Sequence, residues 1–537
     1  MAVPGGLEGR LRSLSFSPYR AGESPLLKVY PSAVELDADL ALIAKVAEGI
    51  RTYTALEGFD RVPRLAAHHG LRVTLGGWLG SDPQHNRQEI EALVRVANAN
   101  PGTVTRVILG NEVLVRHELT PDTLIDHLRE VRARVRQPVS YADVPEVWRF
   151  YPQLGAEVDF VTVHILPYWL DRGVPYAQAE RYLLDQVAEL RGRFPNKPLL
   201  IGESGWPAAG RPRGPALPGR VAQAGYLRML ARVAARHDFD YNVIEAFDQP
   251  WKGALEGLVG AHWGLFTFDR MLKYPPTGPI EPMPGWPWRA VPALLAGAGI
   301  ILLATRRTGL RGLPLLGLAV AAQGLSALTM LAVDRLLGDA FTPLVLVWAL
   351  LTAILLATLA AGSLLVGARI LAESGGGRHP RLLALFLASL LLVLIHSARL
   401  VLAGHLLDIP VLQPAVPAAC LLLLAVLRRL HGLPWGHALA LHELFDAPAR
   451  VRPPRPAWYR STLLGGLLLL AAALGVLVSE AFEAVVHDFG RDQNLLGRLA
   501  TAWGWLGASP VADAWSGLLV VLAVPFIATV RLGTRRA

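Results

Sequence analysis

The chain has 537 residues, of which 52% are hydrophobic and 18% are charged. Charged residues occur throughout the segment before about Tyr274, whereas Leu, Ala and Val dominate from about Trp288 onward. Several apolar runs in the second half are long enough to cross a hydrocarbon layer of about 30 Å. This distribution excludes a purely soluble protein. It also excludes a pure membrane bundle, because the first half contains no spanning segment.

The net charge of +9 arises from 52 Lys and Arg against 43 Asp and Glu. The excess lies in short loops between apolar runs, for example at Arg306, Arg307, Arg428 and Arg429. Membrane orientation explains this placement, and no basic stripe interleaved with aromatic residues predicts a nucleic-acid partner. The single cysteine, Cys420, excludes a disulfide or a cysteine-based metal site within one chain. We expect no metal and no cofactor.

Short apolar or β-branched runs alternate with longer amphipathic segments from Leu14 onward. The predicted strands are Leu14–Tyr19, Gly49–Thr54, Arg72–Trp78, Thr105–Asn111, Val139–Ala142, Phe160–Leu166, Pro198–Glu203 and Val243–Phe247. Predicted helices between them include Asp37–Glu48, Gln88–Ala99, Thr123–Val135, Ala177–Arg193 and Arg220–Ala235. Such alternation predicts the α/β class and, with eight units, a (β/α)₈ TIM barrel. A doubly wound open sheet is the alternative, but no glycine-rich dinucleotide fingerprint follows the first strand.

Two of the predicted strands run directly into a glutamate. The fourth ends at Asn111-Glu112, and the seventh ends at Glu203, followed by Ser-Gly-Trp-Pro. The carboxyl ends of barrel strands are where catalytic groups gather. Cleavage of a glycosidic bond needs one protonated carboxylic acid and one carboxylate that attacks or activates water. For either glutamate alone, a salt bridge on the barrel rim is an equally good explanation; the pair favours catalysis.

The segments Gly110–Val113 and Glu203–Pro207 resemble glycoside hydrolase family 17, the β-1,3-glucanase family, and the resemblance covers about Leu11 to Tyr274. It implies a retaining (β/α)₈ enzyme with Glu112 as general acid/base and Glu203 as nucleophile. It also implies that Asn111 binds the sugar 2-hydroxyl. Retention predicts about 5–5.5 Å between the two carboxyl groups, and we expect a raised pKa for the acid Glu112.

Two further segments resemble the same family. Val163–Tyr168 is similar to its Asn-x-Tyr-Pro-Tyr segment, with Tyr168 as the last tyrosine, and we expect Tyr168 to bind substrate. His164 departs from that pattern; we place it among the substrate-binding residues, and its exact role stays open. Ala246–Lys252 and Glu256 are similar to its charged tail. The resemblance implies that Lys252 and Glu256 surround the catalytic pair, and we expect Lys252 to keep Glu203 ionised. An ordinary surface lysine is the alternative for Lys252.

Four tryptophans follow predicted strand ends: Trp78, Trp169, Trp206 and Trp251. Their faces suit stacking on the apolar side of glucose rings, although they could instead seal the mouth of the barrel. We expect sugar contacts for Trp206 and Trp251, and leave both interpretations open for Trp78 and Trp169.

The chain divides into a predicted barrel (1–274), a Pro/Gly-rich linker (275–289) and an all-α, multi-span transmembrane domain (290–537). The seven predicted spans are Ala290–Thr305, Leu313–Val333, Phe341–Ile370, Leu382–Ala403, Pro410–Val426, Thr462–Val478 and Trp515–Val530. Ala500–Gly507 predicts an interfacial helix. Arginines follow the first, third and fifth spans and the last one, which predicts a cytoplasmic C-terminus and a periplasmic barrel. The first sixteen residues lack the apolar stretch of a signal peptide, so export needs an upstream segment, a reverse anchor or a different span count.

A family 17 barrel fused to a multi-span tail resembles bacterial membrane proteins assigned to β-(1,3)/(1,6)-glucan synthesis. The resemblance implies an inner-membrane transglycosylase that uses β-glucan as donor and acceptor, with the lipid bilayer as its other partner. A membrane-tethered β-1,3-glucan hydrolase is one alternative. A non-catalytic glucan-binding or export module is another, but it has no need of the two glutamates.

Overall fold

A computed structural model describes residues 9–170, 173–338, 340–372, 379–403, 407–445, 456–487, 495–505, 507 and 509–534. The chain forms two compact units, Met1–Pro282 and Met283–Ala537, which divide within the segment predicted to be a linker. Several charged residues used to predict orientation, namely Arg378, Asp488, Arg535 and Arg536, lie outside the described residues.

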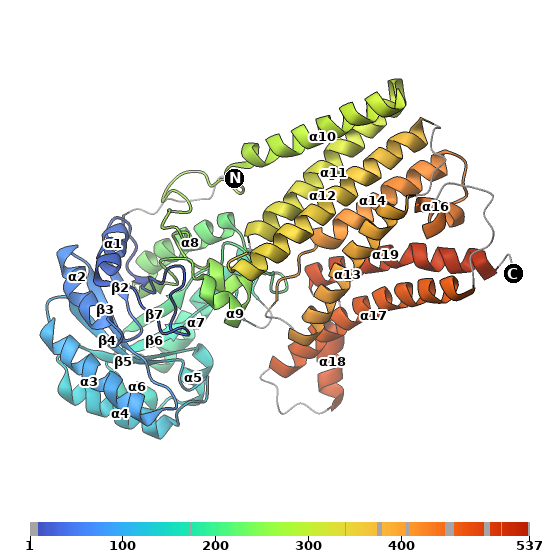
Figure 1. Ribbon diagram of the computed structural model, residues 1–537. Helices are drawn as coiled ribbons and strands as arrows, with labels where there is room; N and C mark the ends of the chain where they lie inside the picture. Colours follow the sequence, from blue (N-terminus) through green and yellow to red (C-terminus); the bar gives the residue numbers. More distant parts are fainter. Residues whose placement is uncertain are drawn as a thin grey trace. The chain divides into compact units, whose positions relative to one another are not determined.

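In the first unit, eight parallel strands follow one another around a closed barrel (Figure 1). They are β1 Leu14–Ser15, β2 Gly49–Arg51, β3 Arg72–Gly77, β4 Val104–Asn111, β5 Val139–Asp143, β6 Val161–His164, β7 Leu199–Ser204 and β8 Asp240–Val243. β8 pairs with β1 and closes the ring. The predicted TIM barrel is confirmed, and the open-sheet alternative is wrong.

Helices and 3₁₀ turns connect these strands. They are α1 Ala33–Ile43, η1 Phe59–Arg61, α2 Val62–His68, α3 Pro83–Ala99, α4 Pro121–Arg134, α5 Pro145–Phe150, α6 Leu154–Glu157, η2 Tyr176–Gln178, α7 Ala179–Arg193, α8 Arg220–His237, η3 Pro250–Lys252, α9 Gly253–Glu256 and η4 Leu258–His262. α1 begins earlier than predicted because Ser32 and Glu35 form a capping box. α3 and α4 begin at Pro83 and Pro121, each preceded by a capping side chain, Asp82 and Thr120.

The last strand differs most from its prediction. β8 covers Asp240–Val243 in place of Val243–Phe247. Its Asn242 is buried and bridges the neighbouring strands, donating from Nδ2 to Ser15 Oγ at 2.8 Å and to the Gly202 carbonyl at 3.0 Å. After Val243 the Ile244 N–H donates to the Ser204 carbonyl and the Ala246 N–H to the Ser15 carbonyl, and Phe247 then pairs with Phe266. The residues that follow, including Glu245, therefore lie beyond the carboxyl end of β8.

The second unit is helical. Its elements are α10 Trp286–Thr308, α11 Gly312–Gly338, α12 Pro343–Leu371, α13 Pro380–Ala403, α14 Leu412–Leu430, α15 Trp435–Ala438, α16 Leu441–Phe445, α17 Pro456–His487, α18 Leu495–Trp505 and α19 Pro510–Thr534. Seven of the described helices, α10 to α14, α17 and α19, are long and apolar enough to cross a membrane, and each contains most of one predicted span. α18 overlaps the segment predicted to be interfacial.

Candidate active site

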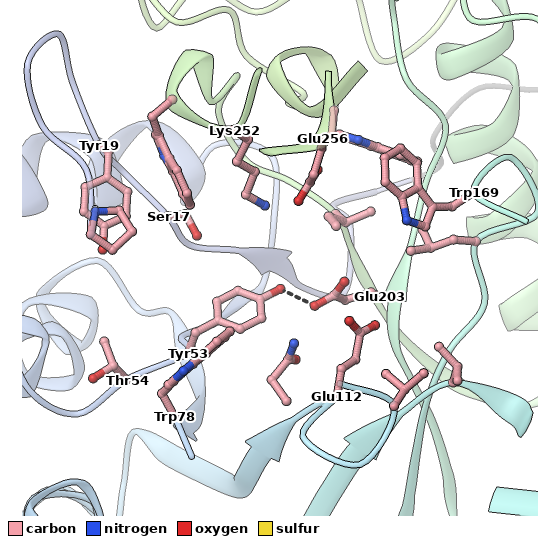
Figure 2. Close-up of a pocket in the computed structure, with 18 of the residues that line it drawn as sticks. Ser17, Tyr19, Tyr53, Thr54, Trp78, Glu112, Trp169, Glu203, Lys252 and Glu256 are labelled. Carbon is pink, nitrogen blue, oxygen red and sulfur yellow. Dashed lines mark hydrogen bonds between the residues drawn. The ribbon is translucent and has the colours of Figure 1, made fainter. Parts of the chain in front are cut away.

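A cavity of about 570 Å³ opens at the carboxyl ends of the barrel strands (Figure 2). Acidic and aromatic side chains dominate its wall. The lining includes Tyr19, Tyr53, Glu57, Trp78, Asn111, Glu112, Trp169, Glu203, Trp251, Lys252, Glu256 and Trp263. Both glutamates predicted from the strand ends therefore face one cavity.

The carboxylates of Glu112 and Glu203 point toward one another (Figure 2). One oxygen of each, together with a ring nitrogen of His164, lies within 4.8 Å of the other two atoms. Retaining pairs have carboxyl groups about 5–5.5 Å apart, whereas inverting pairs are about 6.5–9.5 Å apart. The separation is that of a retaining pair.

The backbone holds Glu112 in an unusual conformation. Glu112 has a φ of +56°, in the left-handed region, two residues after Gly110 with a φ of +82°. Its N–H donates to the Ala142 carbonyl of β5 at 2.8 Å. A left-handed non-glycine residue costs roughly 1–2 kcal/mol and is often found where function fixes a side chain. The turn after β4 thus aims Glu112 at the cavity.

Arg51 of β2 connects the groups around Glu203. Its guanidinium is buried and donates to Asn111 Oδ1 at 2.6 Å, to the Gly202 carbonyl at 2.8 Å and to Glu203 Oε1 at 3.4 Å. Sequence reasoning expected Lys252 to be the cation beside Glu203. The structure assigns that place to Arg51, whose charge favours an anionic nucleophile.

Tyr53 ends a chain of hydrogen bonds that runs from Asn242 of β8 through Ser15 of β1 to Glu203. Its hydroxyl donates to Glu203 Oε1 at 2.7 Å (Figure 2). It therefore accepts from the Ser15 hydroxyl at 2.7 Å, and Ser15 Oγ in turn accepts from Asn242. Burial and the charge of Glu203 hold the pKa of Tyr53 well above its usual value, so the phenol remains a donor.

His164, at the end of β6, lies between the carboxylates of Glu112 and Glu203. Its Nδ1 lies 2.7 Å from Glu112 Oε1, and its Nε2 lies 3.7 Å from Glu203 Oε1. Burial raises the pKa of Glu112, but the hydrogen bond with His164 and the charges of Arg116 and Arg51 outweigh burial, and the net pKa is lowered. The expectation of a raised pKa for this acid is wrong in the unliganded arrangement.

Lys252 is neither a surface lysine nor a direct partner of Glu203. Its ammonium forms an ion pair with Glu245, a buried carboxylate beyond β8. Burial raises the pKa of Glu245 to about 7 although Lys252 opposes the shift. Glu256 also lines the cavity, and burial raises its pKa as well. Lys252 and Glu256 thus line the same cavity as Glu112 and Glu203 (Figure 2).

Glu112, His164 and Glu203 are close enough to share a metal ion. Arg51 argues against that use, because its guanidinium lies 3.1 Å from His164 Nε2 and 3.4 Å from Glu203 Oε1. A cation at this place would meet a fixed positive charge. The residues present suit acid/base and nucleophilic chemistry better than metal binding.

Residues 13–264, just under half of the chain, match the family described as the BtgE/BtgC glycoside hydrolase domain. The glucan 1,3-beta-glucosidase of Arthroderma benhamiae is 27% identical over 247 residues, which cover 42% of this chain and 78% of that protein. The enzyme of the same name from Schizosaccharomyces pombe is 26% identical over 256 residues, covering 44% and 78%.

The barrel is a glycoside hydrolase domain. Among solved structures, a glycoside hydrolase family 17 β-1,3-glucanosyltransferase from Rhizomucor miehei superposes with a TM-score of 0.44 at 24% identity, covering 49% of this chain and 95% of that one. The match to residues 13–264 lies within the region where the sequence resembles family 17.

Two residues predicted to contact sugar lie in the core of the glycoside hydrolase domain instead. Trp206 is fully buried, packs against Tyr168 and Tyr226, and donates from Nε1 to the Leu217 carbonyl at 2.9 Å. Tyr168 is also fully buried, with its hydroxyl bonded to the Arg211 carbonyl. These positions correct the prediction for both residues. Trp251 does line the cavity, as do Trp78 and Trp169, for which the sequence left two interpretations open.

Sequence reasoning missed three residues of the site: Arg51, Tyr53 and Glu245. Arg51 and Tyr53 belong to the predicted strand Gly49–Thr54, where an arginine that points into a barrel is itself a signal. Glu245 interrupts the apolar run Val243–Phe247, which is the same signal that drew attention to Glu203. A charged side chain within a buried strand needs a partner. This signal marks Arg51 and Glu245 in the sequence, but not the uncharged Tyr53.

Proposed function

We propose that the glycoside hydrolase domain is a retaining β-glucan transglycosylase, with Glu203 as nucleophile and Glu112 as general acid/base. The short separation of the two carboxylates across the cavity carries this proposal. The relatives named glucan 1,3-beta-glucosidase support a β-1,3-glucan as donor.

The contacts of Glu203 indicate which oxygen attacks. Tyr53 and Arg51 both donate to Oε1, so Oε2 is left to attack the anomeric carbon. As the new C–O bond forms, the bond to the departing sugar breaks, and Glu112 gives its proton to the leaving oxygen. A glucosyl ester on Glu203 results, with Glu112 now ionised.

The second half of the reaction reverses these roles. A hydroxyl of an acceptor glucan attacks the anomeric carbon while Glu112 takes its proton, and Glu203 leaves as a carboxylate. Transfer lengthens or branches the acceptor and needs no nucleotide sugar. The aromatic lining, with Trp78, Trp169 and Trp251, supports a chain of glucose rings as the ligand.

Asn111 is placed to hold the sugar next to the nucleophile. Its Oδ1 accepts from Arg51 at 2.6 Å, so the Nδ2 hydrogens remain as donors at the cavity wall. An amide donor there suits the 2-hydroxyl of the glucosyl unit, whose hydrogen bonds strengthen in the transition state.

Hydrolysis is the second candidate, because the named relatives are glucosidases. Water then replaces the acceptor sugar, and the first half of the reaction is unchanged. The glycoside hydrolase match disfavours a purely binding or exporting module.

The product length distinguishes transfer from hydrolysis. Full-length protein in detergent should convert laminari-oligosaccharides into products longer than the substrate; shorter products alone would favour the hydrolase. Glu203→Gln should abolish both activities. Glu189→Gln is the matched control, because Glu189 lies on α7 in an exposed ion pair with Arg149. Turnover retained by Glu203→Gln would contradict the assigned nucleophile.

We further propose that the seven apolar helices anchor this domain in a bacterial inner membrane, with the barrel periplasmic and the C-terminus cytoplasmic. Arginines at the ends of α10, α14 and α19 support this orientation. A protease-sensitive tag placed at the N-terminus should be cleaved in spheroplasts, whereas a C-terminal tag should be protected. The reverse pattern would overturn the orientation.

A further inference from the structure

His164 is the one buried histidine at the catalytic pair, and charged groups face it from four strands. Glu112 follows β4, Glu203 lies on β7, Arg51 lies on β2, and Asp143 lies at the end of β5. Its side chain has no exposed surface, so its two nitrogens are fixed by these neighbours. The role of His164 toward Glu112 rests on the proposed function, in which Glu112 is the general acid/base.

The tautomer of His164 follows from Arg51. A guanidinium carries only hydrogen-bond donors. Since Arg51 Nη1 lies 3.1 Å from His164 Nε2, that nitrogen accepts the hydrogen bond. The ring proton is then on Nδ1, which donates to Glu112 Oε1 at 2.7 Å. The contacts of His164 thereby place a donor on Nδ1 and an acceptor on Nε2.

This donor makes the two oxygens of Glu112 different. Oε1 accepts from His164, so a proton on Glu112 has its place on Oε2. We propose that His164 is a positioning residue that fixes Glu112 Oε2 as the oxygen that delivers the proton to the leaving sugar and takes it back from the acceptor. Asp143 does not compete for His164 Nδ1, because it accepts from the Tyr141 hydroxyl and from the Val144 N–H.

A donor on Oε1 also stabilises the ionised form of Glu112. Removing that donor while leaving the other charges in place should raise the pKa of the acid. The alkaline limb of kcat/KM against pH reports this group in the free enzyme, so the limb should move to higher pH.

Two substitutions separate positioning from packing. His164→Asn places an amide nitrogen near the position of Nδ1 and keeps a donor for Glu112, whereas His164→Leu fills the space without a donor. In full-length protein, we expect His164→Leu to lower kcat/KM on laminari-oligosaccharides about ten-fold or more. We also expect it to move the alkaline limb upward by about one pH unit. His164→Asn should retain the wild-type limb.

The leaving group gives a second readout. The dinitrophenolate of a dinitrophenyl β-laminaribioside leaves with little help from an acid. If the defect of His164→Leu is specific to the acid, this variant should cleave that substrate within about three-fold of wild type. Equal losses on both substrates, or an unchanged alkaline limb in His164→Leu, would overturn the inference. If either result is found while Glu203→Gln is inactive, only the role of His164 is refuted and the proposed function stands. If Glu203→Gln is active, both the proposed function and the role of His164 are refuted.

Discussion

Tyr53 donates a 2.7 Å hydrogen bond to Glu203 Oε1 and is itself held by the Ser15 hydroxyl. The proposed nucleophile therefore takes its orientation from residues on or next to the first two strands of the barrel, which lie far from β7 in the sequence. Tyr53→Phe keeps the ring and removes only this donor. A hydrogen bond to a charged group contributes about 1.5–3 kcal/mol, so kcat/KM on laminari-oligosaccharides should fall roughly ten- to a hundred-fold.

Tyr151→Phe is the matched control for that change, because Tyr151 caps α5 and does not line the cavity. It should leave kcat/KM unchanged. If Tyr53→Phe keeps wild-type kcat/KM while its melting temperature matches the control, the hydrogen bond does not orient the nucleophile.

Arg51 should matter for stability as well as for activity. Arg51→Met removes the partner of buried Glu203 and the donor that holds Asn111. Breaking a buried ion pair by removing one partner costs about 3–5 kcal/mol. Arg51→Lys should not restore activity, because an ammonium cannot reproduce the forked contacts of a guanidinium. Thermal unfolding followed by tryptophan fluorescence measures the loss.

The comparison for Arg51 is Arg106→Met, which breaks the half-exposed pair of Arg106 with Asp240 on the same barrel. Exposed pairs contribute about 0–1 kcal/mol, so its melting temperature should change little. Equal melting temperatures for Arg51→Met and Arg106→Met would refute the role of Arg51 as a buried organiser.

Glu89 should make stability depend on pH. It is buried on α3 and accepts from the Ala55 N–H at 2.5 Å and from the Thr54 hydroxyl at 2.8 Å. Burial raises its pKa from 4.5 to about 7. A raised folded-state pKa gives stability that is complete below pH 4.5 and is lost as the pH rises through about 7. The loss is at most about 3 kcal/mol.

Glu89→Gln tests this dependence, because it replaces the titrating carboxyl with an amide of similar size whose oxygen can still accept from the Ala55 N–H. Melting temperatures at pH 5 and pH 8 should differ less in this variant than in wild type. Other groups with raised pKa, such as Glu245, affect both proteins alike, so the difference isolates Glu89. An identical pH response in the two proteins would show that Glu89 is ionised throughout.

The sequence allows prediction of the barrel, and of two glutamates that face one cavity, because both depend on local pattern. Each strand is a short apolar run, and Glu112 and Glu203 directly follow two of them. The supporting contacts are not local: Arg51 meets Asn111, His164 and Glu203 from 60 to 152 residues away. Such pairs form only when the barrel closes, which a single sequence does not reveal.

The misplaced residues have a related cause. Trp206 belongs to the motif that identified Glu203, but adjacency in a motif does not say which way a side chain points after a strand. Lys252 was expected beside Glu203 from the resemblance of the segment Ala246–Lys252 to the charged tail of the family, and that resemblance does not show the buried partner Glu245. In the structure β8 ends at Val243, and Glu245 forms the ion pair with Lys252.

Trp206 and Trp251 should respond to the same substitution in opposite ways. Trp251→Ala removes a ring from the cavity wall, and losing about 1.5 kcal/mol of contact should raise KM roughly ten-fold with little change in melting temperature. Trp206→Ala empties a fully buried site and should cost about 3–5 kcal/mol of stability. KM should stay near wild type at temperatures where this variant is folded. Raised KM with an unchanged melting temperature in Trp206→Ala would instead mean that Trp206 turns into the cavity and stacks on the sugar.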